Sequence, residues 1–447
     1  MTLWFETALL PGGWARDVRI VLSGARIGAI ETGVAAQPGD SRHGVALPGL
    51  PDLHSHAFQR AMAGLAEAPG GAGRDDFWSW RETMYRLVGR LTPEDVLSVA
   101  AMAYCEMLEA GFTRVGEFHY LHHDADGRAY AEPARMAAAV ASASAETGIA
   151  LTLLPVFYAH AGFGGAAPSE AQRRFVSDLD GFARLREGCA TALAGLDGAV
   201  LGIAPHSLRA VTPGELSALL GLAPDGPVHI HVAEQVPEVE ACLAWSGARP
   251  VRWLLDHAPV GDRWCLVHAT HVERDEVAGI VASGAVVGLC PITEANLGDG
   301  LFPVGALLDA GGKFGVGSDS NVRIDAAEEL RLLEYGQRLL HRQRNVLARD
   351  DRSTGRTLFD HALAGAAQAL GASPAGIAVG APADIVALAS DGEGASGDAL
   401  LDRRIFARGD IEAVWRAGRA VVRDGRHVAR DAIAARYRRT LARLVSQ

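Results

Sequence analysis

The most informative stretch of the sequence is PGLPDLHSH (residues 48–56), which ends an apolar run with two histidines placed two positions apart. On a β-strand, residues i and i+2 point to the same face about 6.5 Å apart, so His54 and His56 could grip one metal ion. Surface loops also carry histidine pairs, so the motif alone is a weak indication of a metal site. Its meaning depends on what the rest of the chain places around the end of this strand.

Outward from this stretch, short apolar runs alternate with longer segments of helical periodicity, such as residues 93–110 and 170–184. Eight alternating β/α units predict an α/β protein built as a (β/α)8 TIM-type barrel. A doubly wound sheet is the alternative, but no glycine-rich dinucleotide turn follows the first strand. The predicted strands are residues 45–53, 113–118, 150–157, 200–205, 228–231, 265–268, 286–290 and 314–317.

Both ends of the chain contain short strands separated by glycine and proline, which predict one small β-sandwich formed from both chain ends. The expected domains are residues 1–46 for the N-terminal part of the sandwich, 47–370 for the barrel, and 371–447 for the C-terminal part of the sandwich plus a terminal helix. The glycine-rich segment 66–76 fits a lid and an irregular loop equally well.

Polar residues follow the predicted strands at their C-terminal ends, which converge on the active site in a barrel. His231, near the end of the fifth strand, is favoured as a ligand over His229, which shares its face and would then be a packing partner. Asp319 follows the eighth strand and would face the ion from the opposite wall, although an aspartate there is also a common helix N-cap. Together these positions predict a metal site of His54, His56, His231 and Asp319.

Two further side chains are candidates for the chemistry. Glu234 lies three residues beyond His231, where a carboxylate can move protons to and from a bound water. A favourable charge at a helix N-terminus is the alternative reading of Glu234. His268 ends the sixth strand, and its alternative is a semi-buried histidine without a role in catalysis. The stretch 290–293 after strand seven is assigned no role.

Along nearly its whole length the chain resembles the amidohydrolase superfamily, as seen in PGLPD (48–52), GAPAD (380–384) and WRAGR (415–419). Binuclear members carry a carbamylated lysine on strand four, but the only lysine here is Lys313, which begins strand eight. The resemblance therefore implies the mononuclear branch, which uses the same four ligands and a glutamate at the position of Glu234. Three nitrogen ligands and one oxygen ligand suit one Zn²⁺ per subunit, and Fe²⁺ fits the same set.

Other polar residues predict an anionic substrate. His206 and Arg209 follow strand four, Tyr120 follows strand two, and Gln59 follows the metal motif. An arginine fork binds a carboxylate through two charge-assisted hydrogen bonds, whereas a nucleobase pocket would rely less on arginine. Arg81 is either a further part of this clamp or a surface residue of a helix.

Five stretches resemble one subfamily, the formimidoylglutamate deiminases of histidine degradation: LHSHAFQR (53–60), WSWR (78–81), GEFHY (116–120), PHSLR (205–209) and TEANLGDG (293–300). The resemblance implies hydrolysis of N-formimino-L-glutamate to N-formyl-L-glutamate and ammonia. In that reaction Glu234 would move the proton, while His268 and Asp319 would hold the attacking oxygen. The residues implied to bind the formimino and carboxylate ends of the substrate are Gln59, Tyr120, His206 and Arg209.

Two other functions remain open from the sequence. A nucleobase or S-adenosylhomocysteine-type deaminase would use the same mononuclear barrel, but Arg209 and Tyr120 favour an anionic substrate. A binding or scaffold protein that has lost its chemistry would lack a ligand or the carboxylate, and this chain retains all of them.

The composition of the chain limits which partners it can bind and in which compartment it is expected. A formal net charge of −11 makes nucleic acid and anionic membranes poor partners. No apolar run approaches the roughly 18 residues of a membrane span, and the N-terminus has no signal-peptide pattern. The five cysteines are scattered and form no C-x-x-C pair, which predicts reduced thiols in the cytoplasm. The family resemblance is compatible with a homodimer.

Overall fold

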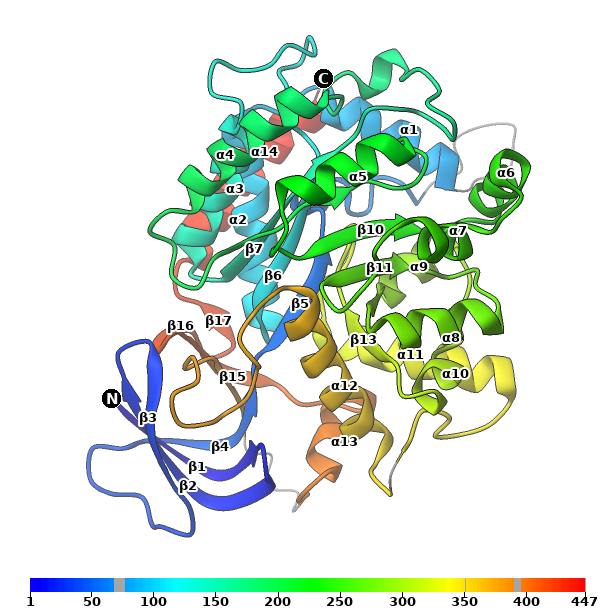
Figure 1. The fold of residues 1–447 in the computed structure, drawn as a ribbon. Coiled ribbons are helices and arrows are strands. Elements are labelled where there is room, and N and C mark those ends of the chain that lie inside the picture. Colours follow the sequence, from blue (N-terminus) through cyan, green and yellow to red (C-terminus); the bar gives the residue numbers. More distant parts are fainter. Residues whose placement is uncertain (68–76, 350, 390–394, 447) are drawn as a thin grey trace.

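A parallel barrel surrounded by helices forms the larger part of the molecule, and a separate sheet lies beside its lower end (Figure 1). The computed structural model describes residues 1–67, 77–349, 351–389 and 395–446. Most of the expected lid or loop, residues 66–76, therefore lies outside the described residues. Among the helices that are described, none is long and apolar enough to cross a membrane.

The barrel strands run parallel and pair with their neighbours in chain order. A bridge between Ile203 and Val228 joins its two halves, and a bridge between Ser55 and Asp319 closes the ring. This arrangement confirms the predicted (β/α)8 barrel. The strands are β5 (Leu50–Ser55), β6 (Phe112–His119), β7 (Ala150–Phe157), β8 (Val200–Leu201), β9 (Ala204–Pro205), β10 (Val228–Val232), β11 (Trp264–His268), β12 (Val286–Leu289) and β13 (Lys313–Val316).

Two of the predicted strands are each broken in two. The expected strand 45–53 divides between β4 (Ser41–Pro48) in the terminal sheet and β5 in the barrel. The break falls at Gly49, where a Cβ atom would lie 2.2 Å from the Thr113 side chain, so a larger residue would not fit. The expected strand 200–205 is interrupted at Gly202, where a Cβ atom would lie 2.5 Å from the carbonyl oxygen of Pro227. Both interruptions follow from close approach of neighbouring strands.

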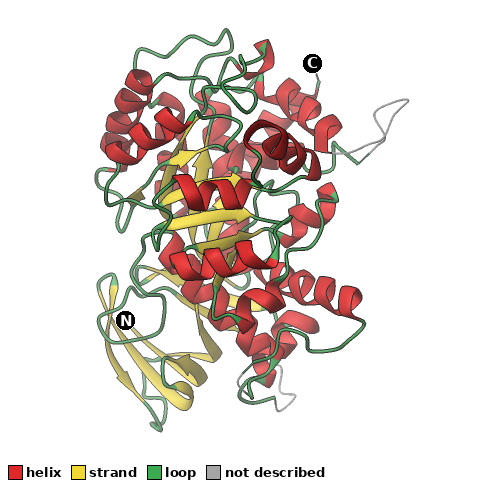
Figure 2. Ribbon diagram, turned by 45° about the vertical axis from the view of Figure 1, so that its right-hand side comes forward, coloured by secondary structure: helices red, strands yellow, loops and turns green. Residues whose placement is uncertain are grey.

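Helices cover the outside of the barrel (Figure 2). In α2 (Pro93–Ala110) the sequence sets both ends: Thr92 and Asp95 form a capping box, and Gly111 ends the helix in the left-handed conformation. The other helices are α1 (Phe77–Val88), α3 (Arg135–Thr147), α4 (Leu179–Leu193), α5 (Pro213–Leu222), α6 (Val236–Ser246), α7 (Pro250–His257), α8 (Arg274–Ser283), α9 (Pro291–Leu297), α10 (Val304–Asp309), α11 (Ala326–His341), α12 (Thr354–Ala369), α13 (Ala399–Phe406) and α14 (Arg430–Val445), with the 3-10 helices η1 (Ala57–Met62) and η2 (Glu170–Gln172).

The C-terminal end of α12 closes the N-terminal end of the barrel. The carbonyl oxygen of Leu370, just beyond α12, accepts a hydrogen bond of 3.0 Å from Thr152 in β7. Ala366 and Leu370 join an apolar cluster with Leu53 of β5, inside the barrel. Gly365 permits this approach, since a Cβ atom there would lie 1.9 Å from the carbonyl oxygen of Phe314. With this end closed, small molecules reach the barrel interior from the opposite end.

Strands from both chain ends form the separate eight-stranded sheet, as predicted, in the order β17-β16-β15-β14-β4-β1-β2-β3. The sheet curls so that its two halves face each other: the rings of Phe5 and Trp415, three strands apart in this order, lie 6.3 Å apart. A bridge between Arg26 and Pro382 joins the edge strand β3 to the segment before β14. Besides β4, the sheet contains β1 (Thr2–Leu10), β2 (Gly13–Ser23), β3 (Arg26–Glu31), β14 (Ile385–Leu388), β15 (Ile411–Arg416), β16 (Arg419–Arg423) and β17 (Arg426–His427).

The terminal helix α14 packs against barrel helix α2, where the hydroxyls of Thr440 and Ser98 lie 3.1 Å apart. The segment 371–447 therefore contributes to both parts of the molecule. The domain boundaries after residues 46 and 370 remain a prediction.

Candidate metal centre and active site

Four side chains meet at the C-terminal mouth of the barrel. His54 and His56 come from the end of β5, His231 from β10, and Asp319 from the turn after β13. The Nε2 atom of His54 lies 3.2 Å from that of His56 and 3.0 Å from that of His231. The Asp319 Oδ1 atom lies 3.2 Å from His56 Nε2 and 3.5 Å from His54 Nε2. All four are buried, and their ligand atoms converge as they would around a single cation.

The four residues are in the protonation states that a metal ion requires of its ligands, with neutral imidazoles and an ionised carboxylate. Burial lowers the pKa of His54 to about 3 and also lowers the pKa values of His56 and His231, so the three imidazoles are neutral and their lone pairs are available. His56 Nδ1 lies 2.9 Å from the carbonyl oxygen of Phe118, which fixes the tautomer that leaves Nε2 free. Burial alone would raise the pKa of Asp319, but its contacts with His54 and His56 hold it below its usual range. The residues therefore fit a divalent cation with three nitrogen ligands and one oxygen ligand.

His229, the alternative to His231, points the other way. Its Nε2 atom lies 2.8 Å from the carbonyl oxygen of Ala369, at the closed end of the barrel. The structure thus separates the two histidines of β10 by function, with His231 at the mouth and His229 in contact with α12.

A buried polar network holds the ligand-bearing segments together. The Asp52 carboxylate accepts hydrogen bonds from the backbone N–H of His54 (3.3 Å) and from the backbone N–H (3.0 Å) and hydroxyl (2.6 Å) of Ser318. Asn321 Nδ2 donates to Ser55 Oγ at 3.1 Å. These bonds tie β5 to the turn that carries Asp319, and groups of this kind orient metal ligands.

The backbone is unusual at the same strand ends. Ala233, His268 and Asp319 have φ values of 53°, 65° and 46°, in the left-handed region that residues other than glycine seldom occupy. Such conformations cost about 1–3 kcal/mol each and persist only where surrounding contacts determine them. They occur here next to or at the residues expected to carry the chemistry.

Glu234 and His268 face each other beside the metal cluster. Glu234 is buried, which raises its pKa to about 7, so its carboxyl group can both accept and return a proton near neutral pH. His268 Nε2 lies 3.9 Å from Glu234 and 3.9 Å from Asp319, while its Nδ1 atom lies 3.2 Å from Glu294. Burial alone would lower the pKa of His268, but these three carboxylates raise it.

Glu238 fixes the turn that carries Glu234. Its carboxylate accepts hydrogen bonds from the backbone N–H groups of Ala233 (3.2 Å) and Glu234 (3.1 Å). Glu238 is only 2% exposed, and it lies in the first turn of α6. It therefore stabilises the left-handed conformation of Ala233 from which the Glu234 side chain projects.

A pocket opens from the metal cluster toward the side chains predicted to bind substrate. Gln59 Nε2 donates to Tyr120 Oη at 2.7 Å, which leaves the Tyr120 proton free to donate further. Among the described residues, the buried atoms Gln59 Oε1 and Arg209 Nε have no hydrogen-bond partner. The nearby carboxylates Glu238 and Glu234 raise the pKa of Arg209 although burial alone would lower it, so this guanidinium stays charged. Besides His56, His231 and Asp319 of the cluster, the polar residues that line the pocket include Gln59, Arg81, Tyr120, His206, Arg209, Glu234 and His268.

Helix α1 forms the remaining wall of this pocket. Trp80, Arg81, Met84 and Tyr85 line it from one side of the helix. The guanidinium carbon of Arg81 lies 4.2 Å from the ring centre of Trp78. Arg81 thus lies at the pocket while being only partly buried, which combines the two alternatives that the sequence left open.

The sequence did not reveal the supporting residues Asp52, Glu238 and Glu294. In the sequence, Asp52 stands out only as part of the stretch 48–56 and Glu294 only as part of the stretch 293–300, and neither stretch indicates a role for it. The signal that could have found Glu238 is its place four residues after Glu234, where a carboxylate in the first turn of a helix can reach the preceding backbone amides.

Neutral imidazoles and a carboxylate at the mouth of a parallel barrel, beside a buried glutamate of raised pKa, define a class: metal-dependent hydrolases in which water is activated by a cation and a general base. Residues 45–426 match the Amidohydrolase family, and residues 2–44 match the family Formimidoylglutamate deiminase HutF, N-terminal domain.

The chain is 51% identical to formimidoylglutamate deiminase of Pseudomonas aeruginosa, over 99% of each chain. A crystal structure of an amidohydrolase from Brucella melitensis superposes with a TM-score of 0.97 at 55% identity, covering 99% of each chain. A 5-methylthioadenosine/S-adenosylhomocysteine deaminase of Natronomonas pharaonis is 27% identical over 79% of this chain and 77% of its own. The chain therefore belongs to the amidohydrolase family and, within it, to the formimidoylglutamate deiminases, which makes it a hydrolase acting on C–N bonds.

Proposed function

We propose that the protein hydrolyses N-formimino-L-glutamate to N-formyl-L-glutamate and ammonia, as a step of histidine degradation. The observation that carries the proposal is that the His54–His56–His231–Asp319 cluster adjoins a pocket lined by the charged Arg209, whose Nε atom has no hydrogen-bond partner within the described part of the chain. A substrate with a hydrolysable amidine at one end and carboxylates at the other matches both features. The 51% identical relative of Pseudomonas aeruginosa bears the corresponding name.

The chain's own residues suit each step of this reaction. A divalent cation held by the four ligands would supply hydroxide at neutral pH by lowering the pKa of a bound water. Glu234 takes the proton of the attacking water, whose oxygen forms a bond to the amidine carbon. The amidine reacts in its protonated form, so the addition gives a hydroxyl and an amino group on the same carbon. Glu234 then returns its proton to the amino group, the C–N bond breaks and ammonia leaves, while the hydroxyl proton passes to Glu234 and on to solvent as the carbonyl forms. His268, held by Glu294, orients the attacking oxygen.

The binding groups fix the substrate in that orientation. The free Oε1 atom of Gln59 accepts a hydrogen bond from an amidine N–H, and Arg209 pairs with a carboxylate. Tyr120 donates its remaining proton, and His206 and Arg81 complete the wall. Holding the reacting carbon near the nucleophile is itself a large contribution to rate.

Zinc is the metal we propose, one per subunit, because tetrahedral nitrogen and oxygen ligands are typical of Zn²⁺, and Fe²⁺ is the alternative. The proposal includes a cytoplasmic homodimer that binds neither nucleic acid nor membranes. The net charge of −11 argues against binding to nucleic acid or anionic membranes, and the five free, buried cysteines support a reducing compartment such as the cytoplasm.

Ammonia release is the direct test. Zinc-loaded and iron-loaded protein are each incubated with N-formimino-L-glutamate and, in parallel, with guanine, adenosine and S-adenosylhomocysteine. We expect rapid release from formiminoglutamate alone. Release only from a purine derivative would contradict the proposed substrate and support the deaminase alternative on the same barrel.

A further inference from the structure

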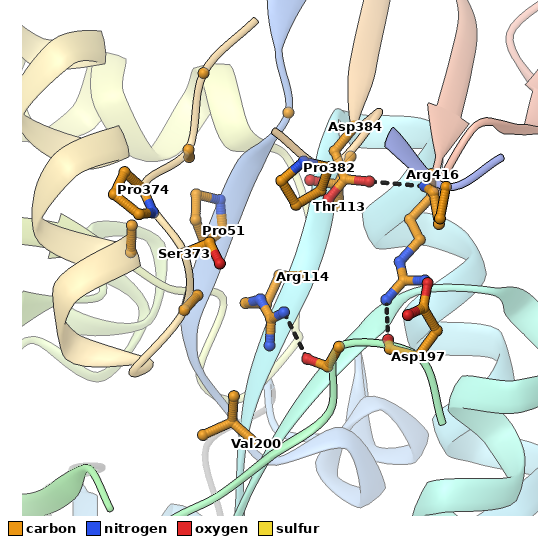
Figure 3. A pocket seen from close by; sticks show the side chains of 18 of the residues that line it. Pro51, Thr113, Arg114, Asp197, Val200, Ser373, Pro374, Pro382, Asp384 and Arg416 are labelled. Carbon is orange, nitrogen blue, oxygen red and sulfur yellow. Dashed lines mark hydrogen bonds and ion pairs between the residues drawn. The ribbon is translucent and has the colours of Figure 1, made fainter. Parts of the chain in front are cut away.

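A second cavity lies at the opposite end of the barrel, where the terminal sheet meets the first residues of β5, β6 and β8 (Figure 3). Its volume is about 270 Å³, and it shares no lining residue with the active-site pocket. Nothing in the proposed reaction uses this space, which we call the interface cavity. It is lined by residues of both the barrel and the sheet.

Two arginines reach into the interface cavity from the two sides (Figure 3). Arg114 of β6 donates to the carbonyl oxygen of Gly198 at 2.8 Å and to Thr152 Oγ1 at 3.1 Å. Arg416 of β15 donates to the carbonyl oxygen of Asp197 at 2.5 Å. All three acceptors are neutral oxygens, so the charge of the two guanidinium groups is offset only by the nearby carboxylates.

Two carboxylates lie beside these cations. Asp384 is partly buried and interacts electrostatically with both Arg114 and Arg416, and its Oδ1 atom accepts a hydrogen bond of 2.8 Å from the backbone N–H of Ala417. The Asp197 side chain is 68% exposed and lies 3.6 Å from Arg416 Nη1, where solvent weakens the attraction. Arg26 adds a third cation at the rim, where it donates to the carbonyl oxygen of Gly380.

Three arginines and two aspartates line the interface cavity, so its lining carries one excess positive charge in a protein whose net charge is −11. Burial and the neighbouring Arg416 lower the pKa of Arg114 to about 10, which reflects the cost of holding this charge. Arg416 Nε is buried and has no hydrogen-bond partner among the described residues. Planar guanidinium groups match oxyanions in shape and charge.

From these contacts we infer that the interface cavity binds a small oxyanion, a phosphate or a carboxylate, between the sheet and the barrel. The ligand would contact Arg114 and Arg416 together and offset the remaining positive charge of the lining. Because one arginine belongs to the barrel and the other to the sheet, binding would hold the two parts together and raise the melting temperature. The site is independent of the proposed reaction, so neither result decides the other.

Calorimetric titration and thermal melting of metal-loaded protein test this site, with inorganic phosphate in one arm and succinate in the other, at constant ionic strength against chloride. We expect saturable binding of at least one of these anions and a higher melting temperature. Arg114→Gln should weaken the binding at least tenfold. Ser373→Glu should do the same, because it adds a negative charge at the exposed rim without removing a hydrogen bond made by the arginines.

Arg128→Gln is the matched control, since its side chain is 87% exposed and does not line the cavity. It changes the net charge as Arg114→Gln does and should leave binding unchanged. The inference is overturned if neither anion binds saturably. It is equally overturned if binding persists undiminished in Ser373→Glu, because an anion bound at the metal centre would be insensitive to that change.

Discussion

The two walls of the active-site pocket are built in different ways. The metal wall consists of His54 and His231 on barrel strands, His56 directly after β5, and Asp319 in a turn bonded to β5. The substrate wall consists of side chains from η1, from α1 and from the segments after β6 and β9. Strand positions are fixed by the hydrogen bonds of the barrel, whereas helix and loop positions are set by fewer contacts. From this difference we expect turnover to depend on the metal wall and substrate affinity on the substrate wall, so that variants of the two walls change kcat and KM separately.

The largest effect is expected for Glu234→Gln, which changes the proposed proton-transfer group and leaves all four proposed metal ligands intact. Positioned general acid–base groups contribute about 10²–10⁴-fold to rate, so kcat should fall roughly 10³-fold. Metal content should stay at one per chain, because Glu234 is not among the ligands. Stopped assays for ammonia and metal analysis of the purified variant measure both quantities.

Glu170→Gln is the matched control, since the Glu170 side chain is 87% exposed and does not line the pocket. It should behave as wild type. If Glu234→Gln retained a kcat within a few-fold of wild type, the proton shuttle would have to be another group, and His268 would be the next to test.

Arg209→Gln should act on the other wall. Removing a charge-assisted hydrogen bond costs about 1.5–3 kcal/mol, which corresponds to a loss of roughly 10–150-fold in kcat/KM. We expect most of this loss in KM, because the carboxylate of the substrate lies away from the reacting carbon. Arg209→Lys should recover part of it by restoring the charge without the fork.

The most specific test of Arg209 is the enzyme's preference for the substrate over an uncharged analogue. Wild type should prefer formiminoglutamate to an analogue in which the carboxylate farther from the formimino group is replaced by an amide. Arg209→Gln should lose most of that preference. An equal loss of activity toward the acid and the amide would contradict a carboxylate contact and point to a structural role.

Glu238→Gln should have a smaller effect on the metal wall. A glutamine side chain offers one carbonyl oxygen, so it can accept from only one of the two amides, of Ala233 and Glu234, that Glu238 now holds. We expect kcat to fall about tenfold through misplacement of Glu234, with KM and metal content unchanged. A profile of kcat against pH that stays as in wild type, together with an unchanged kcat, would show that Glu238 does not position the proton shuttle.

The sequence predicted the barrel and placed the four ligand residues together because both depend on periodic signals. A histidine pair on a strand, and polar residues at successive strand ends, follow directly from strand geometry. The sequence could not show that the run 45–53 is two strands, because the break at Gly49 depends on contact with Thr113, which is distant along the chain. The curl of the terminal sheet likewise follows from a long-range contact, that of Phe5 with Trp415.

The supporting residues were harder to predict for a different reason. Glu238 and Asp52 act by accepting hydrogen bonds from backbone amides, and no pattern of side chains marks which amides lack a partner. The left-handed conformations of Ala233, His268 and Asp319 were equally hidden, because the residue types there do not favour them. Such sites are determined by the assembled structure rather than by local sequence.

The smallest effect is expected for Arg81→Gln, and it tests whether α1 belongs functionally to the substrate wall. Arg81 is only partly buried and lies over the ring of Trp78, so solvent screens its charge and the ring already holds it in place. We expect KM to rise a few-fold while kcat and the loss caused by Arg209→Gln stay unchanged, so that the two substitutions add in free energy. Steady-state kinetics of both single variants and the double variant measure this directly. A strongly non-additive double variant would instead show that the two arginines grip one carboxylate together, and the substrate wall would then be a single clamp spanning α1 and the barrel.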